Sequence, residues 1–163
     1  MIQIKHLPII DLAETLKKYG ACSEAINWAT GQPDAATAWR RCPRGDWMLW
    51  IAERVGVPRK LLVLAACRCA RLVLTHVPPG ESRPLKAIEI AEAWARGEAS
   101  DKDVADAVAA VRAVSADIWA ASAAASAASD ATHEACARAV REVVAFKDVM
   151  DAINHHKSTG EPQ

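Results

Sequence analysis

The sequence LLVLAACRCARLVLTHV, residues 61–77, is apolar around nearly its whole circumference if it is helical. A strand is the alternative for its first part, but the length of the run and the alanines and cysteines that follow favour a helix. Pro58 precedes it and is well suited to open a helix, because its missing N–H has no partner in the first turn. A helix that is apolar all round is usually buried, so we expect residues 61–77 to form the centre of the core.

Shorter helices are predicted on both sides of this segment from their end signals. Caps, glycines and prolines mark where helices begin and end. The predicted helices are 9–18, ended by Gly20; 22–29, ended by Gly31; one capped by Asp34 that stops before Pro43; one capped by Asp46 and ended by Gly56; one from about Pro84 to Gly97; and one capped by Ser100 with Asp103 three residues later.

The last third is rich in alanine and carries two interleaved seven-residue series, one from Val104 to Ile153 and one from Val108 to Met150. Such series are typical of a packed helical seam. Residues 129–132 can form a turn, so we expect a long antiparallel pair of Ala-rich helices. Alanine and serine at the seam allow helices to approach closely and would also allow a homodimer.

Composition predicts one all-α domain, a multi-helix bundle over residues 1–156 with a frayed polar tail at 157–163. The chain has 163 residues, of which 52% are hydrophobic and 25% charged, which excludes a disordered polyampholyte. Its formal net charge is zero, which argues against direct nucleic-acid binding. The charge-free stretch 118–129 is too short to span a membrane.

The cysteines predict a cytoplasmic protein with free thiols. Cys22, Cys42, Cys67, Cys69 and Cys136 are odd in number, and the first residues lack the apolar region of a secretory signal. Cys67 and Cys69 would point about 200° apart on a helix, so one ion cannot bind both. His133-Glu134 begins like a zinc-protease motif, but residue 137 is alanine. We expect no metal, no cofactor and no catalytic residue.

The densest group of tryptophan and arginine lies in residues 39–50, WRRCPRGDWMLW. Its candidate residues are Trp39, Arg44, Asp46, Trp47 and Trp50. Tryptophan and arginine anchor protein interfaces, and they also form cation–π pairs inside folds. The structural use is favoured over the interface use.

Two further features concern charge. Arg68 and Arg71 lie on one side of the central helix and need carboxylate partners if buried, for which Asp46, Glu81 and Glu89 are the candidates. Asp103, Asp106 and Asp117 fall on a helix face turned away from the valines. A solvated surface is the simpler interpretation of that face, and a docking face for a basic partner is the alternative.

Several blocks together resemble a family of bacterial immunity proteins that are found beside polymorphic toxins and in prophage-like regions. They are residues 21–28, 38–50 with the motif RGDWMLW, 64–72, 83–89 and 93–100, the last of which contains Trp94. The resemblance covers roughly residues 20–130. It implies a helical fold and a toxin as partner, and it carries no catalytic residues.

The sequence therefore predicts a non-enzymatic inhibitor that binds another bacterial protein, namely a toxin. The alternative is a phage-encoded inhibitor of a host defence complex, of the anti-CRISPR type. An enzyme is the third class, which a pocket joining Arg68, Arg71, Glu89 and a tryptophan would favour.

Overall fold

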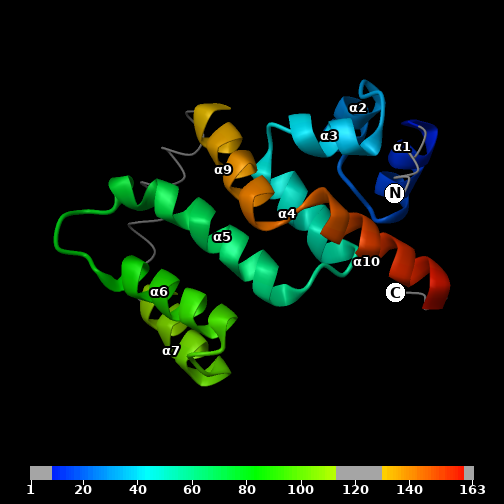
Figure 1. The fold of residues 1–163 in the computed structure, drawn as a ribbon. Coiled ribbons are helices and arrows are strands. Elements are labelled where there is room, and N and C mark those ends of the chain that lie inside the picture. The colour runs from blue at the N-terminus through cyan, green and yellow to red at the C-terminus, as the bar shows by residue number, and fades with distance from the viewer. Residues whose placement is uncertain (1–8, 113–129, 160–163) are drawn as a thin grey trace.

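The computed structural model describes residues 9–112 and 130–159, and over these ranges it is helical throughout, without a strand (Figure 1). The elements are α1 (Ile9–Lys18), α2 (Ser23–Thr30), α3 (Ala35–Arg41), α4 (Gly45–Arg54), α5 (Arg59–Val73), the short 3₁₀ helix η1 (Leu74–His76), α6 (Arg83–Arg96), α7 (Asp101–Arg112), α9 (Asp130–Val143) and α10 (Phe146–Thr159). The predicted all-α multi-helix bundle is confirmed.

Helix α5 lies in the middle of the molecule. It packs against α9 and α4 on one side and against α6 on the other, and α7 packs on α6. Figure 1 shows α6 and α7 at one end of the molecule and α1, α2, α3 and α10 at the other. The helical segments on either side of α5 therefore form two groups, and α5 joins them.

The core is shared between α5 and the helices around it: Ala65 of α5 is fully buried, together with side chains in and next to α4 and α9. Met48, Val55, Val140 and Val144 are fully buried. Leu72 of α5, by contrast, keeps 43% of its surface exposed. The reason is geometric: within the described residues, α5 is packed mainly between α9 and α4 on one side and α6 on the other, so its apolar sequence is not buried all round.

Helix α7 packs against α6, whereas α9 packs across α5 and α4. The expected antiparallel Ala-rich pair, with its turn at 129–132, falls largely on residues 113–129, which lie outside the described residues. A seven-residue repeat defines an apolar face, but it does not determine which helix covers that face. Here α5 covers part of the apolar face of α9.

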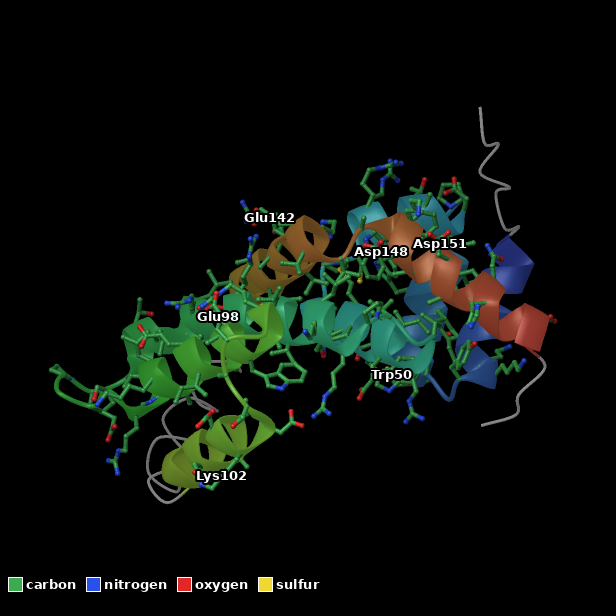
Figure 2. All side chains as sticks on the ribbon, turned by 60° about the horizontal axis from the view of Figure 1, so that its bottom comes forward. Trp50, Glu98, Lys102, Glu142, Asp148 and Asp151 are labelled. Atoms are coloured by element: carbon green, nitrogen blue, oxygen red, sulfur yellow. The ribbon has the colours of Figure 1, made fainter. Side chains whose placement is uncertain are left out.

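The helix is interrupted at residues 144–145, between α9 and α10. The seven-residue repeat of the sequence continues through this point without a sign of the interruption. The N–H of Ala145 donates a hydrogen bond to Asp148 Oδ2 at 3.0 Å, which caps the start of α10 (Asp148 is labelled in Figure 2). Helix α10 then continues to Thr159, past the expected start of the polar tail at 157.

Local capping signals are confirmed at two helices and wrong at a third. Asp34 Oδ1 accepts the N–H of Thr37 at 2.7 Å at the start of α3. Ser100 and Asp103 bond reciprocally at the start of α7. Asp46 is not the cap of α4, because the helix already begins at Gly45 and its cap position is Arg44.

The cap of α4 therefore lies two residues before the expected one, and Gly45, the first residue of the helix, lies against the backbone of α9. A Cβ atom at this position would lie 2.8 Å from backbone atoms of Cys136 and Ala137 on α9. Real Cβ atoms do not approach other atoms so closely, so only glycine lets the two backbones meet there.

We expect Gly45→Ala to lower the free energy of unfolding by about 1–3 kcal/mol, as overpacking does. The matched control is Gly31→Ala, since a Cβ there meets only the Trp28 carbonyl oxygen at 3.5 Å. That control should change stability by less than about 1 kcal/mol. Urea denaturation of both variants checks the prediction, and equal stabilities would contradict it.

Candidate functional site

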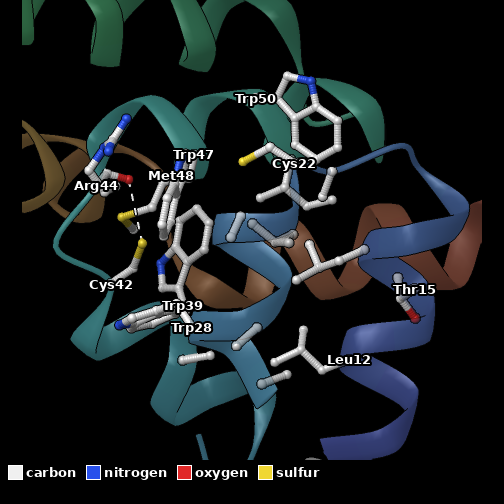
Figure 3. A pocket seen from close by; sticks show the side chains of 18 of the residues that line it. Leu12, Thr15, Cys22, Trp28, Trp39, Cys42, Arg44, Trp47, Met48 and Trp50 are labelled. Carbon is white, nitrogen blue, oxygen red and sulfur yellow. Dashed lines mark hydrogen bonds between the residues drawn. The ribbon is translucent and has the colours of Figure 1, made fainter. Parts of the chain in front are cut away.

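A cavity of about 580 Å³ lies at the end of the molecule formed by α1, α2, α3, α4 and α10. It is half open to solvent, and its walls are mostly apolar (Figure 3). Ligand pockets in proteins are typically apolar clefts of about 300–1,000 Å³ with a few polar groups. The cavity therefore has the size and the chemistry of a binding site.

Four of the six tryptophans of the chain line this cavity: Trp28, Trp39, Trp47 and Trp50. Trp39 is 9% exposed and belongs to the core, whereas the other three are half-buried. The rings of Trp28 and Trp47 lie 6.3 Å apart between centroids at an angle of 57°. Within the Trp/Arg block, Trp39 builds the core, whereas Trp47 and Trp50 line the cavity and are partly exposed to solvent.

The polar side of the cavity is an ion-paired group around Arg44. Its Nε and Nη2 donate to the two carboxylate oxygens of Asp46 at 2.9 and 2.7 Å, and its guanidinium lies 4.8 Å from the centroid of the Trp47 ring. Glu24 Oε1 lies 4.0 Å from Arg44 Nη1. The hydrogen bonds from Arg44 lower the pKa of Asp46 and the same bonds raise the pKa of Arg44, so both groups stay charged at neutral pH.

Contacts with the core fix the position of the Arg44–Asp46 ion pair. Cys42 Sγ donates to the carbonyl oxygen of Arg44 at 3.4 Å. The carbonyl oxygen of Cys42 in turn accepts a hydrogen bond from Arg141 Nη1 of α9 at 2.8 Å. Burial raises the pKa of the Cys42 thiol, which keeps it neutral and able to donate. The segment between α3 and α4 is therefore held in one conformation.

The size of the cavity has an energetic consequence. Empty space in a closed interior destabilises a fold. This cavity is open on one side and water can enter it, but water gains little against apolar walls. A molecule that replaced this water with apolar contacts would stabilise the fold.

The arginines of α5 lie away from this cavity, and their partners differ from the expected ones. Arg71 pairs with Glu92 of α6 at 2.8 Å, and Arg68 pairs with Glu142 of α9 at 2.8 Å. Both pairs are partly exposed, so neither arginine is buried. The expected partners Asp46, Glu81 and Glu89 were wrong, because distance along the chain does not report which helices pack on α5. None of the residues named for an enzyme site lines the cavity.

Trp94 links three helices at the other end of the molecule. Its indole N–H donates to Asp101 at the start of α7, and the guanidinium of Arg59 at the start of α5 lies 5.4 Å from its ring centroid. These contacts give Trp94 a structural role in joining α5, α6 and α7. It is not part of the cavity.

The predicted acidic face on α7 does not consist of unpaired carboxylates. Asp103 caps the helix through Ser100, whose hydrogen bonds lower the pKa of Asp103. Asp106 forms an ion pair with Lys102, one turn earlier; Lys102 is labelled in Figure 2. Asp117 lies outside the described residues. Two of the three carboxylates therefore already have partners. The interpretation of this face from the sequence did not take Lys102 into account.

The thiols are free, and no metal site is found among the described residues. All five cysteines are unpaired, and no group of three or more histidine, cysteine, aspartate or glutamate side chains in residues 9–112 and 130–159 could hold an ion. Burial, followed by the neighbouring Cys136 thiol, raises the pKa of Cys69 to about 12. Within the same ranges, no helix has the length and apolar character needed to cross a bilayer.

Comparisons with protein families, with curated proteins and with solved structures give no match.

Part of the cavity wall was missed by the sequence analysis. Leu12, Thr15 and Leu16 of α1 and Phe146, Val149 and Met150 of α10 line it, although these two helices stand at opposite ends of the chain. The only signal was amphipathicity: both helices present apolar residues one turn apart. That pattern predicts burial, and it does not predict a shared cavity.

We expect the tryptophans of the cavity to differ in their effect on stability. Trp39→Ala should cost about 3–5 kcal/mol, as loss of a buried aromatic ring does. Trp50→Ala should cost less than half as much, because its ring is half-buried beside Arg54. Equilibrium urea unfolding measures both, and an equal loss in the two variants would show that Trp50 belongs to the core.

We also expect the five thiols to react at different rates. Cys22 is exposed at the cavity mouth, so iodoacetamide at pH 8 should alkylate it first. Cys69 should react at least 100-fold more slowly, because little thiolate forms four pH units below its pKa of about 12. Peptide mass mapping against time measures the rates, with Cys22→Ser as control. Comparable rates at Cys22 and Cys69 would contradict the structure.

Proposed function

We propose that the chain is a non-enzymatic inhibitor that binds another bacterial protein, and specifically an immunity protein that neutralises a toxin. The observation that carries the proposal is the concave, half-open surface where Trp47, Trp50 and Arg44 meet solvent. Interfaces depend on a few such side chains, with tryptophan and arginine prominent among them, set in pockets that exclude water.

The rim of the cavity is organised for such a contact before any partner arrives. Arg44 is held by two hydrogen bonds from its guanidinium to Asp46 and lies over Trp47, so little side-chain entropy is lost when a partner covers it. The resemblance of residues 38–50 to bacterial immunity proteins falls on this same segment and supports a toxin as the partner.

The test uses the toxin encoded beside this chain in its native genome, or the protein that the chain captures from its native host. Co-expression should restore the growth that the toxin stops, and calorimetry with the purified pair should show a one-site complex. Arg44→Ala should weaken binding at least 10-fold, because it removes a rim residue and frees Asp46.

The matched control is Arg96→Ala. Arg96 also pairs with a carboxylate two residues later, Glu98, at 2.8 Å, but it lies outside the cavity wall. This variant should bind like the wild type. Equal loss in both variants would remove the rim from the interface, and failure of the wild type to neutralise or bind any such protein would overturn the proposed function.

A further inference from the structure

We infer that the cavity is also a binding site for a small organic cation, a molecule with an apolar body and one positively charged group. This inference goes beyond the proposed function, because it requires no protein partner. It rests on three features of the cavity: its apolar volume, the charges at its mouth and the faces of its tryptophans.

The interior selects an apolar body. The residues that surround the space away from the mouth are aliphatic or aromatic, among them Leu12, Leu16, Ile51, Phe146 and Val149. Alanines of α2 and α3 form much of the remaining wall, so the space is wide and no large side chain fills it. A volume of about 580 Å³ accommodates a fused-ring or branched molecule, which would exchange poorly held water for close contacts.

The mouth selects against an anion. The charged residues that line the cavity are Glu24, Arg44 and Asp46, which together carry one net negative charge. Arg44 is committed to Asp46 by two hydrogen bonds, so a ligand carboxylate would have to displace Asp46 to reach it. Among the described residues that line the cavity, none offers an anion a free positive charge.

Glu24 is the group that a ligand cation would meet. Its side chain is 73% exposed, and its ion-pair contact is with Arg44 at a distance of 4.0 Å. This distance is too long for a hydrogen bond, so the carboxylate oxygens can still accept one from an ammonium group. A cation held by Glu24 would form a direct charge-assisted bond, which is shorter and stronger than the existing contact.

The tryptophan faces add to the same preference. Electron-rich indole faces attract cations, and tryptophan does so more strongly than other aromatic residues. The chain already uses this interaction at the mouth, where Arg44 lies over Trp47. Trp28, whose ring centroid lies 6.3 Å from that of Trp47, is a second indole ring in the cavity wall.

Three probes with one apolar body test the inference: 2-(1-naphthyl)ethylamine, which is a cation at pH 7, 2-(1-naphthyl)ethanol, which is neutral, and 1-naphthylacetate, which is an anion. Isothermal titration of the purified full chain should give the amine the lowest Kd, at least about 10-fold below that of the acetate, with the alcohol between them. The amine should also slow the alkylation of Cys22, which stands at the mouth.

Glu24→Gln isolates the charge. It should raise the Kd of the amine to that of the alcohol and leave the Kd of the alcohol unchanged. The matched control is Glu14→Gln, an exposed glutamate of α1 that does not line the cavity, and it should bind all three probes like the wild type. Thermal melts confirm that both variants fold.

Any other pattern overturns the inference. Equal affinities for the three probes, a preference for the anion, an unchanged amine Kd in Glu24→Gln, or no binding of any probe below 1 mM would each do so. The proposed function fails separately, since it depends on neutralisation or capture of a protein and on Arg44→Ala, and neither enters the probe titrations.

Discussion

The contact of the α4 and α9 backbones at Gly45 is the constraint on which the rest of the structure depends. The two helices come so close there that a Cβ atom would lie 2.8 Å from the α9 backbone. Met48 of α4 and Val55 just after it pack in one core cluster with Val140 of α9 and Val144 just after that helix, and all four are fully buried. Small residues at a helix crossing allow such tight packing, and the large apolar residues one or two turns away then interlock.

The same crossing fixes the candidate site. Because α9 lies against the start of α4, Arg141 reaches the Cys42 carbonyl oxygen at 2.8 Å, and Cys42 in turn donates to the Arg44 carbonyl oxygen. The ion pair at the cavity mouth is thus the outer end of a chain of contacts that begins in the core. Residues 39–50 could have a structural role or an interface role. The two are linked, because the core residues of this segment hold its rim residues in place.

Sequence reasoning succeeded where the determining interactions are local. Asp34 and the Ser100–Asp103 pair act within a few residues of the helix starts they cap, so their spacing is sufficient evidence. It failed where the outcome depends on which helix packs on which. The partners of Arg68 and Arg71 and the shared cavity wall of α1 and α10 both involve residues far apart in the chain. Gly45 is a further case, because its need for a glycine comes from the α9 backbone, which is distant in the chain.

The composition of the chain accounts for the existence of the cavity. Alanine gives α2 and α3 strong helical preference, but Ala25, Ala29, Ala35 and Ala38 line the cavity with side chains too short to fill it. The large residues that surround these alanines are mainly tryptophans. Their flat, rigid rings line the cavity and leave the space between them unfilled. Many small residues combined with a few large aromatic ones thus leave the end of the molecule around the cavity incompletely packed. Since native interiors are otherwise close-packed, a molecule that filled this space would gain contacts that the fold itself leaves unmade.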